Sequence, residues 1–249
     1  MQTTRVTPML RHAAFLVALV SVAVGAQTHD SWRVRVDRSV NAQDPDDSPD
    51  LKFVPIAGGF HITTGPAGTF WNPAHRVSSD YTVKATFTLL KPSGHVNYYG
   101  LVFGGSNIEG VDQNYLYFLV AQNGSYVVRH RAGTAVYDVQ ERTPHDAVKQ
   151  PDANGRSRND LEVRVSGATI SYLVNGVAVL TTSRTPKDSL QTLLGPPRAD
   201  AAGASDPADE ARRLVNLIKQ ASASTDGLVG IRVNHQLDVQ VEGFTVQKP

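Results

Sequence analysis

The feature that most constrains the fold is an alternation of apolar and polar residues with a period of two. In the run from Tyr81 to Leu89, every odd position is apolar and every even position is Thr or Lys. Such a period indicates a strand with one buried face. Related strand patterns are centred on Trp32–Val36, Leu51–Val54, Phe60–Thr64, Tyr98–Phe103, Leu161–Val165, Leu228–Val233 and Leu237–Val246.

Turn signals separate these patterns where hairpins require them. Asn123-Gly124 divides NYLYFLVAQ from SYVVRHRAG, and Asn175-Gly176 divides TISYLV from VAVLTT. Asn-Gly suits a two-residue type I′ turn, whose central residues both need positive φ. No strands alternate with long helices, which argues against a parallel α/β fold. The pattern therefore predicts an all-β protein, a two-sheet antiparallel sandwich.

The first 26 residues are typical of a secretory signal peptide. Arg5 and Arg11 precede the apolar run 13–24, and Val24-Gly25-Ala26 supplies small residues for cleavage after Ala26. The run is shorter than the roughly 20 apolar residues of a membrane span. We expect a secreted or periplasmic protein that begins at Gln27 and has no membrane span after signal removal.

Composition excludes several function classes. Without the signal peptide the formal charge changes from +1 to −1, which gives no basic footprint for nucleic acid. The chain has no cysteine, so disulfides and thiolate metal sites are excluded. Histidines show no zinc-binding spacing, and we expect no metal site of that kind.

The mature chain is expected to form an N-terminal strand and acidic linker (27–50) and a sandwich domain (51–249). Asp44, Asp46, Asp47 and Asp50 offer oxygen ligands, so structural calcium is an alternative to a solvated linker, but their spacing fits no EF-hand loop. Residues 71–75 are expected to form a turn, and residues 140–159 a long surface loop.

An insertion over about 184–226 departs from the strand pattern. It is rich in Ala, Pro, Ser and Asp, and apolar residues recur at helical spacing between Asp206 and Gln220. Pro207 and the acids Asp209 and Glu210 suit the first turn of a helix. We therefore expect a short amphipathic helix in an inserted loop, which is either a decoration of the sandwich or a lid or protein-binding element.

From about Leu51 to Val246 the sequence resembles the concanavalin A-like jelly-roll superfamily, which includes laminin-G-like domains. The residues that carry the resemblance are SDYTVKATFTL, YYGLVFGG, NYLYFLVAQNGSYVVRHRAG, NDLEVRVSGATISYLVNGVAVL and DGLVGIRVNHQLDVQVEGFTVQ. Within the superfamily it is most similar to bacterial secreted 3-keto-disaccharide hydrolase-like domains. The resemblance implies a jelly roll, but the superfamily contains lectins, glycosidases and adhesion modules alike.

Catalytic carboxylates are sparse. Glycosidases need two carboxyl groups that face the scissile bond at a fixed separation. The segments Asn114–Val120 and Ser125–Arg131, where such a fold would carry them, contain no Asp or Glu. The weak candidates are Glu109 and Asp112 in the preceding loop, and Glu141 beyond the following strand. We therefore predict no catalytic residue.

A tyrosine-rich face is the better candidate site. With a two-residue Asn123-Gly124 turn, Tyr117 lies opposite His130, and Arg129 and Arg131 point toward the core. A shift of one residue would instead bring these arginines to the open face and turn the tyrosines inward. Sugars stack on aromatic rings and bond to polar tips. The predicted ligand-binding residues are Tyr98, Gly100, Tyr115, Tyr117, Tyr126 and His130, with Gly100 leaving room for the ligand.

Three functions stay open at this point. The first is an exported, non-catalytic module that binds carbohydrate or glycan. The second is a glycoside hydrolase-like enzyme acting on a keto-disaccharide or related sugar, as the resemblance implies. The third is a structural or adhesion domain that contacts another exported protein through the insertion.

Overall fold

The computed structural model describes residues 31–39, 41, 44–184, 211–212, 214–215, 218 and 222–249. The predicted signal peptide lies outside these residues, as does most of the predicted helix over residues 206–220. The described residues of that segment (Ala211, Arg212, Leu214, Val215 and Ile218) are helical. Over the described part of the chain, no helix combines the length and apolar character needed to cross a membrane.

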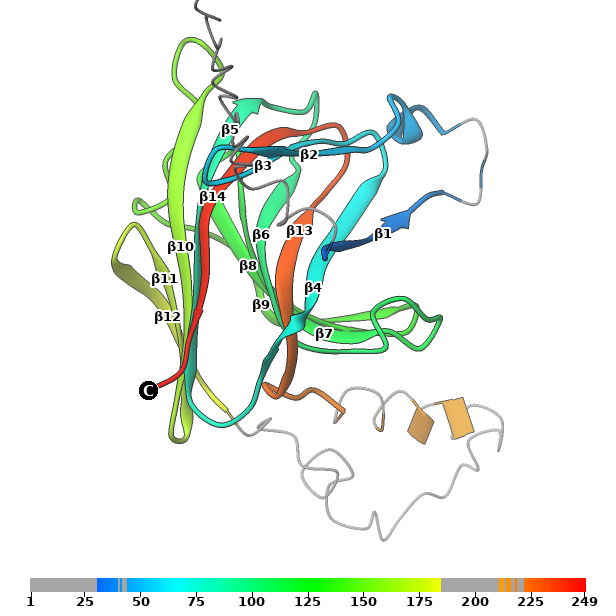
Figure 1. Cartoon of the computed structure of the whole chain (residues 1–249), viewed down its shortest axis with the longest axis vertical. Helices are drawn as coiled ribbons and strands as arrows, with labels where there is room; N and C mark the ends of the chain where they lie inside the picture. The colour runs from blue at the N-terminus through cyan, green and yellow to red at the C-terminus, as the bar shows by residue number, and fades with distance from the viewer. Residues whose placement is uncertain are drawn as a thin grey trace, which may run out of the picture.

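The strands form two seven-stranded sheets, as Figure 1 shows, and this confirms the predicted sandwich. Neighbouring strands are antiparallel throughout. Sheet A has the order β1 (Arg33–Asp37), β4 (Ala67–Val77), β13 (Gly227–Val233), β6 (Tyr98–Ser106), β7 (Asn114–Ala121), β8 (Ser125–Ala132) and β9 (Ala135–Pro144). Sheet B has the order β12 (Val177–Ser183), β11 (Thr169–Val174), β10 (Ser157–Ser166), β5 (Tyr81–Lys91), β14 (Asp238–Gln247), β3 (Gly59–Thr63) and β2 (Lys52–Ile56).

The main core lies between the sheets and contains the apolar side chains of the alternating runs. Val83, Phe87 and Leu89 of β5 face Tyr99, Leu101 and Phe103 of β6 across this layer, and all six are fully buried. The predicted inward positions of β5 are therefore correct. The three central strands of sheet A differ from the others, because β6, β7 and β13 are buried on both faces.

Two segments that we expected to be irregular are strands in whole or in part. Residues 71–75 belong to β4 and do not form a turn. Although Pro73 lacks a backbone donor, the Asn72 side chain accepts a hydrogen bond from the Ala74 amide, and the pairing of β13 with β4 shifts register at this level. Strand β9 extends to Pro144 and β10 begins at Ser157, so the surface loop predicted over residues 140–159 covers only 145–156. The acidic linker contains a short 3₁₀ helix, η1 (Pro45–Asp47).

The hairpin at Asn123-Gly124 has a different register from the one predicted. Tyr117 pairs with Arg129, and Leu116 pairs with His130. Gly124 has a φ of +79°, whereas Asn123 does not have a positive φ. The loop between β7 and β8 is therefore a three-residue turn with a left-handed glycine, rather than a two-residue type I′ turn. This extra loop residue shifts the pairing by one.

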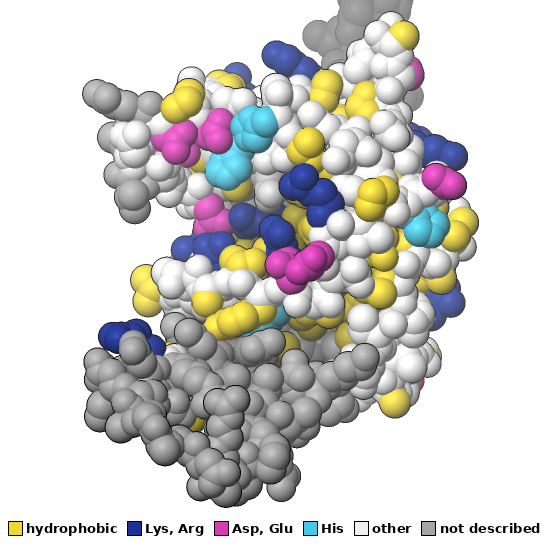
Figure 2. Space-filling view, turned by 180° about the vertical axis from the view of Figure 1, so that it is seen from behind, with side chains coloured by type: hydrophobic (Ala, Val, Ile, Leu, Met, Phe, Trp, Pro, Cys, Tyr) yellow, Lys and Arg dark blue, Asp and Glu magenta, His cyan; other side chains and the backbone are white. Residues whose placement is uncertain are grey.

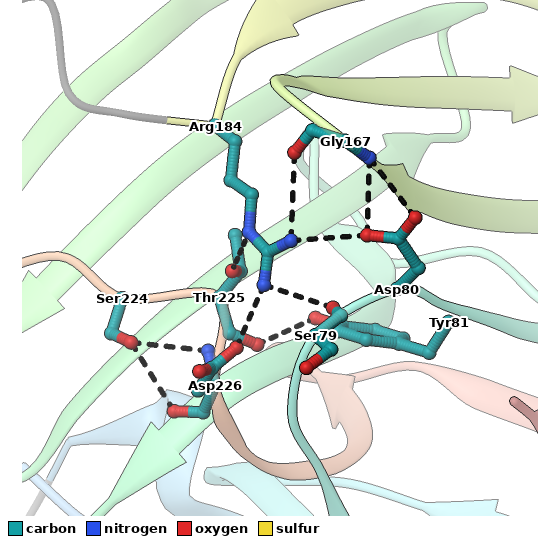
Figure 3. Close-up of polar contacts among 8 residues, drawn as sticks. All are labelled: Ser79, Asp80, Tyr81, Gly167, Arg184, Ser224, Thr225 and Asp226. Atoms are coloured by element: carbon teal, nitrogen blue, oxygen red, sulfur yellow. Dashed lines mark hydrogen bonds and ion pairs between the residues drawn. The ribbon is translucent and has the colours of Figure 1, made fainter.

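The two ends of the insertion are held together by Arg184, which follows β12 (Figure 3). Its guanidinium donates to Thr225 Oγ1 at 3.0 Å, to Asp226 Oδ1 at 3.0 Å and to Asp80 Oδ1 at 3.2 Å. The Tyr81 hydroxyl donates to the Thr225 carbonyl at 2.7 Å. The chain therefore leaves the sandwich after Arg184 and returns before Thr225 at one place, where hydrogen bonds join the two ends.

Candidate functional site

The outer side of sheet A carries a second apolar layer beneath charged side chains. Tyr98, Val102, Tyr115, Tyr117 and Leu119 pack together there with Trp71 and Leu228 of the neighbouring strands. Figure 2 shows a hollow on this side of the molecule, where basic and acidic side chains gather above hydrophobic ones. We call the outer surface that carries Arg35, Arg129, Arg131, Arg142 and Arg232 the arginine face.

A buried ion pair lies at the centre of the arginine face. Arg232 of β13 donates to Asp37 Oδ2 of β1 and to Thr69 Oγ1 of β4, both at 2.8 Å, and to the Tyr115 hydroxyl at 3.2 Å. Burial opposes ionisation of Asp37, but Arg232 and Arg35 outweigh it and lower the pKa of the Asp37 carboxyl. The pair is therefore ionised, and it joins three neighbouring strands.

The other arginines lie around this pair and cover the tyrosines. Arg129 donates to Asp138 Oδ1 of β9 at 2.6 Å, and the Arg142 guanidinium lies 5.5 Å from the centre of the Tyr98 ring. Arg232 lies 5.9 Å from the centre of the Tyr117 ring. Burial raises the pKa of Tyr117, while Arg232, Arg129 and Arg131 act in the opposite direction. A ligand on this face would meet guanidinium groups before aromatic rings.

The predicted ligand-binding residues divide between two sides of sheet A. Tyr98, Tyr115 and Tyr117 lie on the outer side, but only 6%, 0% and 6% of their surface is exposed. Gly100 is explained by the backbone, because a Cβ there would lie 2.3 Å from the Phe118 carbonyl oxygen. It does not leave open space for a ligand.

Tyr126 and His130 lie on the inner side of sheet A, which follows from the one-residue shift in register. Tyr126 belongs to the main core. His130 lines a cavity of about 370 Å³ beside β11 and β12, and its Nε2 lies 2.9 Å from Asn114 Oδ1. Burial lowers the pKa of His130 to about 4. These two side chains cannot join the outer tyrosines in one site.

The candidate carboxylates do not meet His130. Glu109 pairs with Arg33, and Asp112 accepts a hydrogen bond from Asn107, both in a separate shallow pocket that Arg76 and Trp71 also line. Glu141 is exposed on β9. Within the described ranges, no three His, Asp or Glu side chains gather in a group that could hold a metal ion.

Sequence reasoning missed most of the arginine face. It placed Arg129 and Arg131 toward the core, and it did not consider Arg142, Arg232, Asp37 or Asp138. One signal was available for Arg232, because a charged residue interrupts the otherwise apolar segment Leu228–Val233. A charge in such a segment needs a partner when it is buried. The partner is 195 residues away, where no local pattern indicates it.

No family model matches the sequence, and no curated protein matches it. Solved structures resemble its fold. The carbohydrate-binding module CBM66 from Bacillus subtilis aligns with a TM-score of 0.54 at 11% identity, over 88% of this chain and 96% of that one. A Bacillus subtilis protein of unknown function with a galectin-like fold aligns with a TM-score of 0.50 at 12% identity, over 88% and 89%. This likeness agrees with the expected concanavalin A-like jelly roll.

Proposed function

We propose that the protein is a carbohydrate-binding module and that the arginine face is its binding surface. The main support is the set of guanidinium groups held in place above buried tyrosines on a hollowed sheet. Planar guanidinium groups donate several hydrogen bonds in fixed directions, which suits the hydroxyl and ring oxygens of a sugar. Because an ion pair with Asp138 already holds Arg129, binding there would cost little side-chain entropy.

The fold adds weaker support. CBM66 is named as a carbohydrate-binding module, and this chain shares its fold over most of both lengths. A shared fold does not transfer a ligand, because function depends on the residues of the site. The proposal therefore depends mainly on the arginine face.

Export forms part of the proposal. The basic residues, apolar run and small residues of the first 26 positions support a cleaved signal peptide. N-terminal sequencing of the protein recovered from its native compartment should begin at Gln27. A protein that retains Met1 inside the cell would contradict this part.

The binding proposal is tested with a glycan array probed by the wild-type protein and by Arg129→Ala. We expect the variant to lose most of the signal, because Arg129 is partly exposed on the proposed surface. Arg164→Ala is the matched control, since it also removes an arginine from an ion pair on a strand, with Glu162 on sheet B. Array signals that are absent for the wild type, or unchanged in Arg129→Ala, would contradict the proposal.

A further inference from the structure

The charges on the arginine face do not balance. Five guanidinium groups lie there with two carboxylates, those of Asp37 and Asp138. Glu141 is exposed beside Arg142 in the irregular part of β9, and counting it still leaves two positive charges in excess. The protein as a whole carries a formal charge of only +1, so the excess is local.

Two arginines contribute to this excess without an ion-pair partner of their own. Arg35 and Arg232 share Asp37, and Arg129 pairs with Asp138. Arg131 donates to the Gly133 carbonyl at 3.1 Å, and Arg142 contacts the Tyr98 ring. Within the described part of the chain, neither has a carboxylate within ion-pairing distance. Their remaining N–H groups are available to a ligand.

A polar atom beneath Arg142 also lacks a partner. The Tyr98 hydroxyl is buried and has no hydrogen-bond partner among the described residues, and Arg142 lies over the same ring. A buried hydroxyl usually has a partner, and a ligand oxygen that reaches the Tyr98 hydroxyl beside Arg142 would supply one. This observation is independent of the charge balance.

We propose that the arginine face selects acidic saccharides, with one carboxylate of a uronate oligosaccharide bound by Arg131 and another by Arg142. The inference rests on the proposed carbohydrate-binding function and names the class of sugar. A guanidinium group binds a carboxylate through two parallel hydrogen bonds, and these charge-assisted bonds are stronger than bonds to neutral hydroxyls. A uronate-bearing oligosaccharide offers both the carboxylate and the hydroxyl groups that the neighbouring paired arginines can bind.

The test compares an acid with its own neutral ester. Isothermal titration calorimetry is carried out with the full chain and a set of uronate oligosaccharides, including trigalacturonate, each beside its methyl ester. Neutral oligosaccharides and sulfated oligosaccharides form the other arms. We expect at least about tenfold weaker binding of the esters and a loss of affinity for the acids on raising the salt concentration, as charge-assisted recognition requires.

Arg131→Gln and Arg142→Gln identify the residues that make the selection. Each should weaken uronate binding about tenfold while changing the affinity for the methyl ester little, since only the acid gains from the charge. Arg158→Gln is the control, because Arg158 is an exposed arginine on β10 of sheet B. Circular dichroism and thermal melts confirm that each variant folds.

The outcomes separate this inference from the function on which it rests. Equal affinity for acid and ester, a preference for neutral sugars, or binding of the sulfated arm alone would overturn the inference and leave carbohydrate binding intact. Uronate binding that survives in both arginine variants would also overturn it. Failure of every saccharide to bind would contradict both proposals.

Discussion

At the scale of single residues, the Asp37–Arg232 pair matters most to the outer side of sheet A. A buried ion pair gives little net stability relative to apolar residues, but the loss of one partner leaves a charge uncompensated. Asp37→Asn should therefore lower the free energy of unfolding by about 3 kcal/mol or more, as measured by urea denaturation.

An exposed ion pair provides the comparison for this variant. On sheet B, Arg164 Nη2 lies 2.6 Å from Glu162 Oε1, and both side chains are partly exposed. Glu162→Gln should cost less than about 1 kcal/mol, because solvent screens such pairs. Equal effects of the two substitutions would show that Arg232 is not dependent on Asp37.

His130 should make stability depend on pH. Its pKa in the folded protein is lowered to about 4 by burial. In the unfolded chain it is near 6.5, so the unfolded state binds the proton first as the pH falls. Neutral, buried His130 therefore contributes up to about 3 kcal/mol to the free energy of unfolding. This contribution is complete above pH 6.5 and is lost progressively as the pH falls toward 4.

Urea denaturation of the wild type and His130→Gln, at several values between pH 7 and pH 4, measures this contribution. The wild type should lose more stability over this range than the variant, which cannot take up the proton. If both proteins lose stability in parallel, His130 does not carry the effect.

At the scale of elements, the strands were predictable and their exact pairing was not. The alternation in Tyr81–Leu89 identifies the buried face of β5 directly, because successive side chains of a strand point to opposite faces of the sheet and the apolar residues recur at every second position. The register of β7 and β8 depends instead on whether Asn123 has positive φ, and Asn-Gly is compatible with both answers. One dihedral angle therefore decided whether His130 lay on the binding surface.

Gly104 offers a test of the close packing between β6 and the segment that precedes β13. It has a φ of +63°, and a Cβ there would lie 1.8 Å from the Ser224 carbonyl oxygen. Gly58 also has positive φ but has open space around it. Gly58→Ala should cost about 1 kcal/mol, the conformational penalty alone. Gly104→Ala should cost several times more, because backbone must move.

Denaturation midpoints of the two glycine variants give the comparison. The difference between the two midpoints isolates the steric effect, since each variant replaces a glycine that has a positive φ. Similar midpoints would mean that the Ser224 backbone moves aside at little cost.

At the scale of the whole molecule, the order of the strands within each sheet could not be predicted from local sequence patterns. Strand β13 inserts between β4 and β6, and β14 inserts between β5 and β3. Both strands come from the C-terminal end of the chain and pair with strands near its beginning. These pairings bring Arg232 to Asp37, so the arginine face exists only once the whole sandwich has closed.

The insertion should be removable without unfolding the sandwich. Arg184 bonds to Thr225 and Asp226, so the two ends of the insertion are fixed by contacts that do not involve residues 186–221. A variant in which a short Gly-Ser linker replaces residues 186–221 should keep its circular dichroism spectrum, with a Tm within about 5 °C of the wild type, because loop length affects stability only weakly. An unfolded or strongly destabilised variant would show that the sandwich needs the inserted residues.

The burial of β6, β7 and β13 on both faces has a consequence for hydrogen exchange. Amides in such strands exchange only through large openings of the structure, because water reaches neither side. The proposed binding surface therefore lies over β6, β7 and β13, the strands whose amide hydrogens we expect to exchange most slowly. Ligand binding should leave these amides nearly unchanged and should slow exchange at the edges of sheet A, in β1 and β9, where Asp37, Asp138 and Arg142 lie.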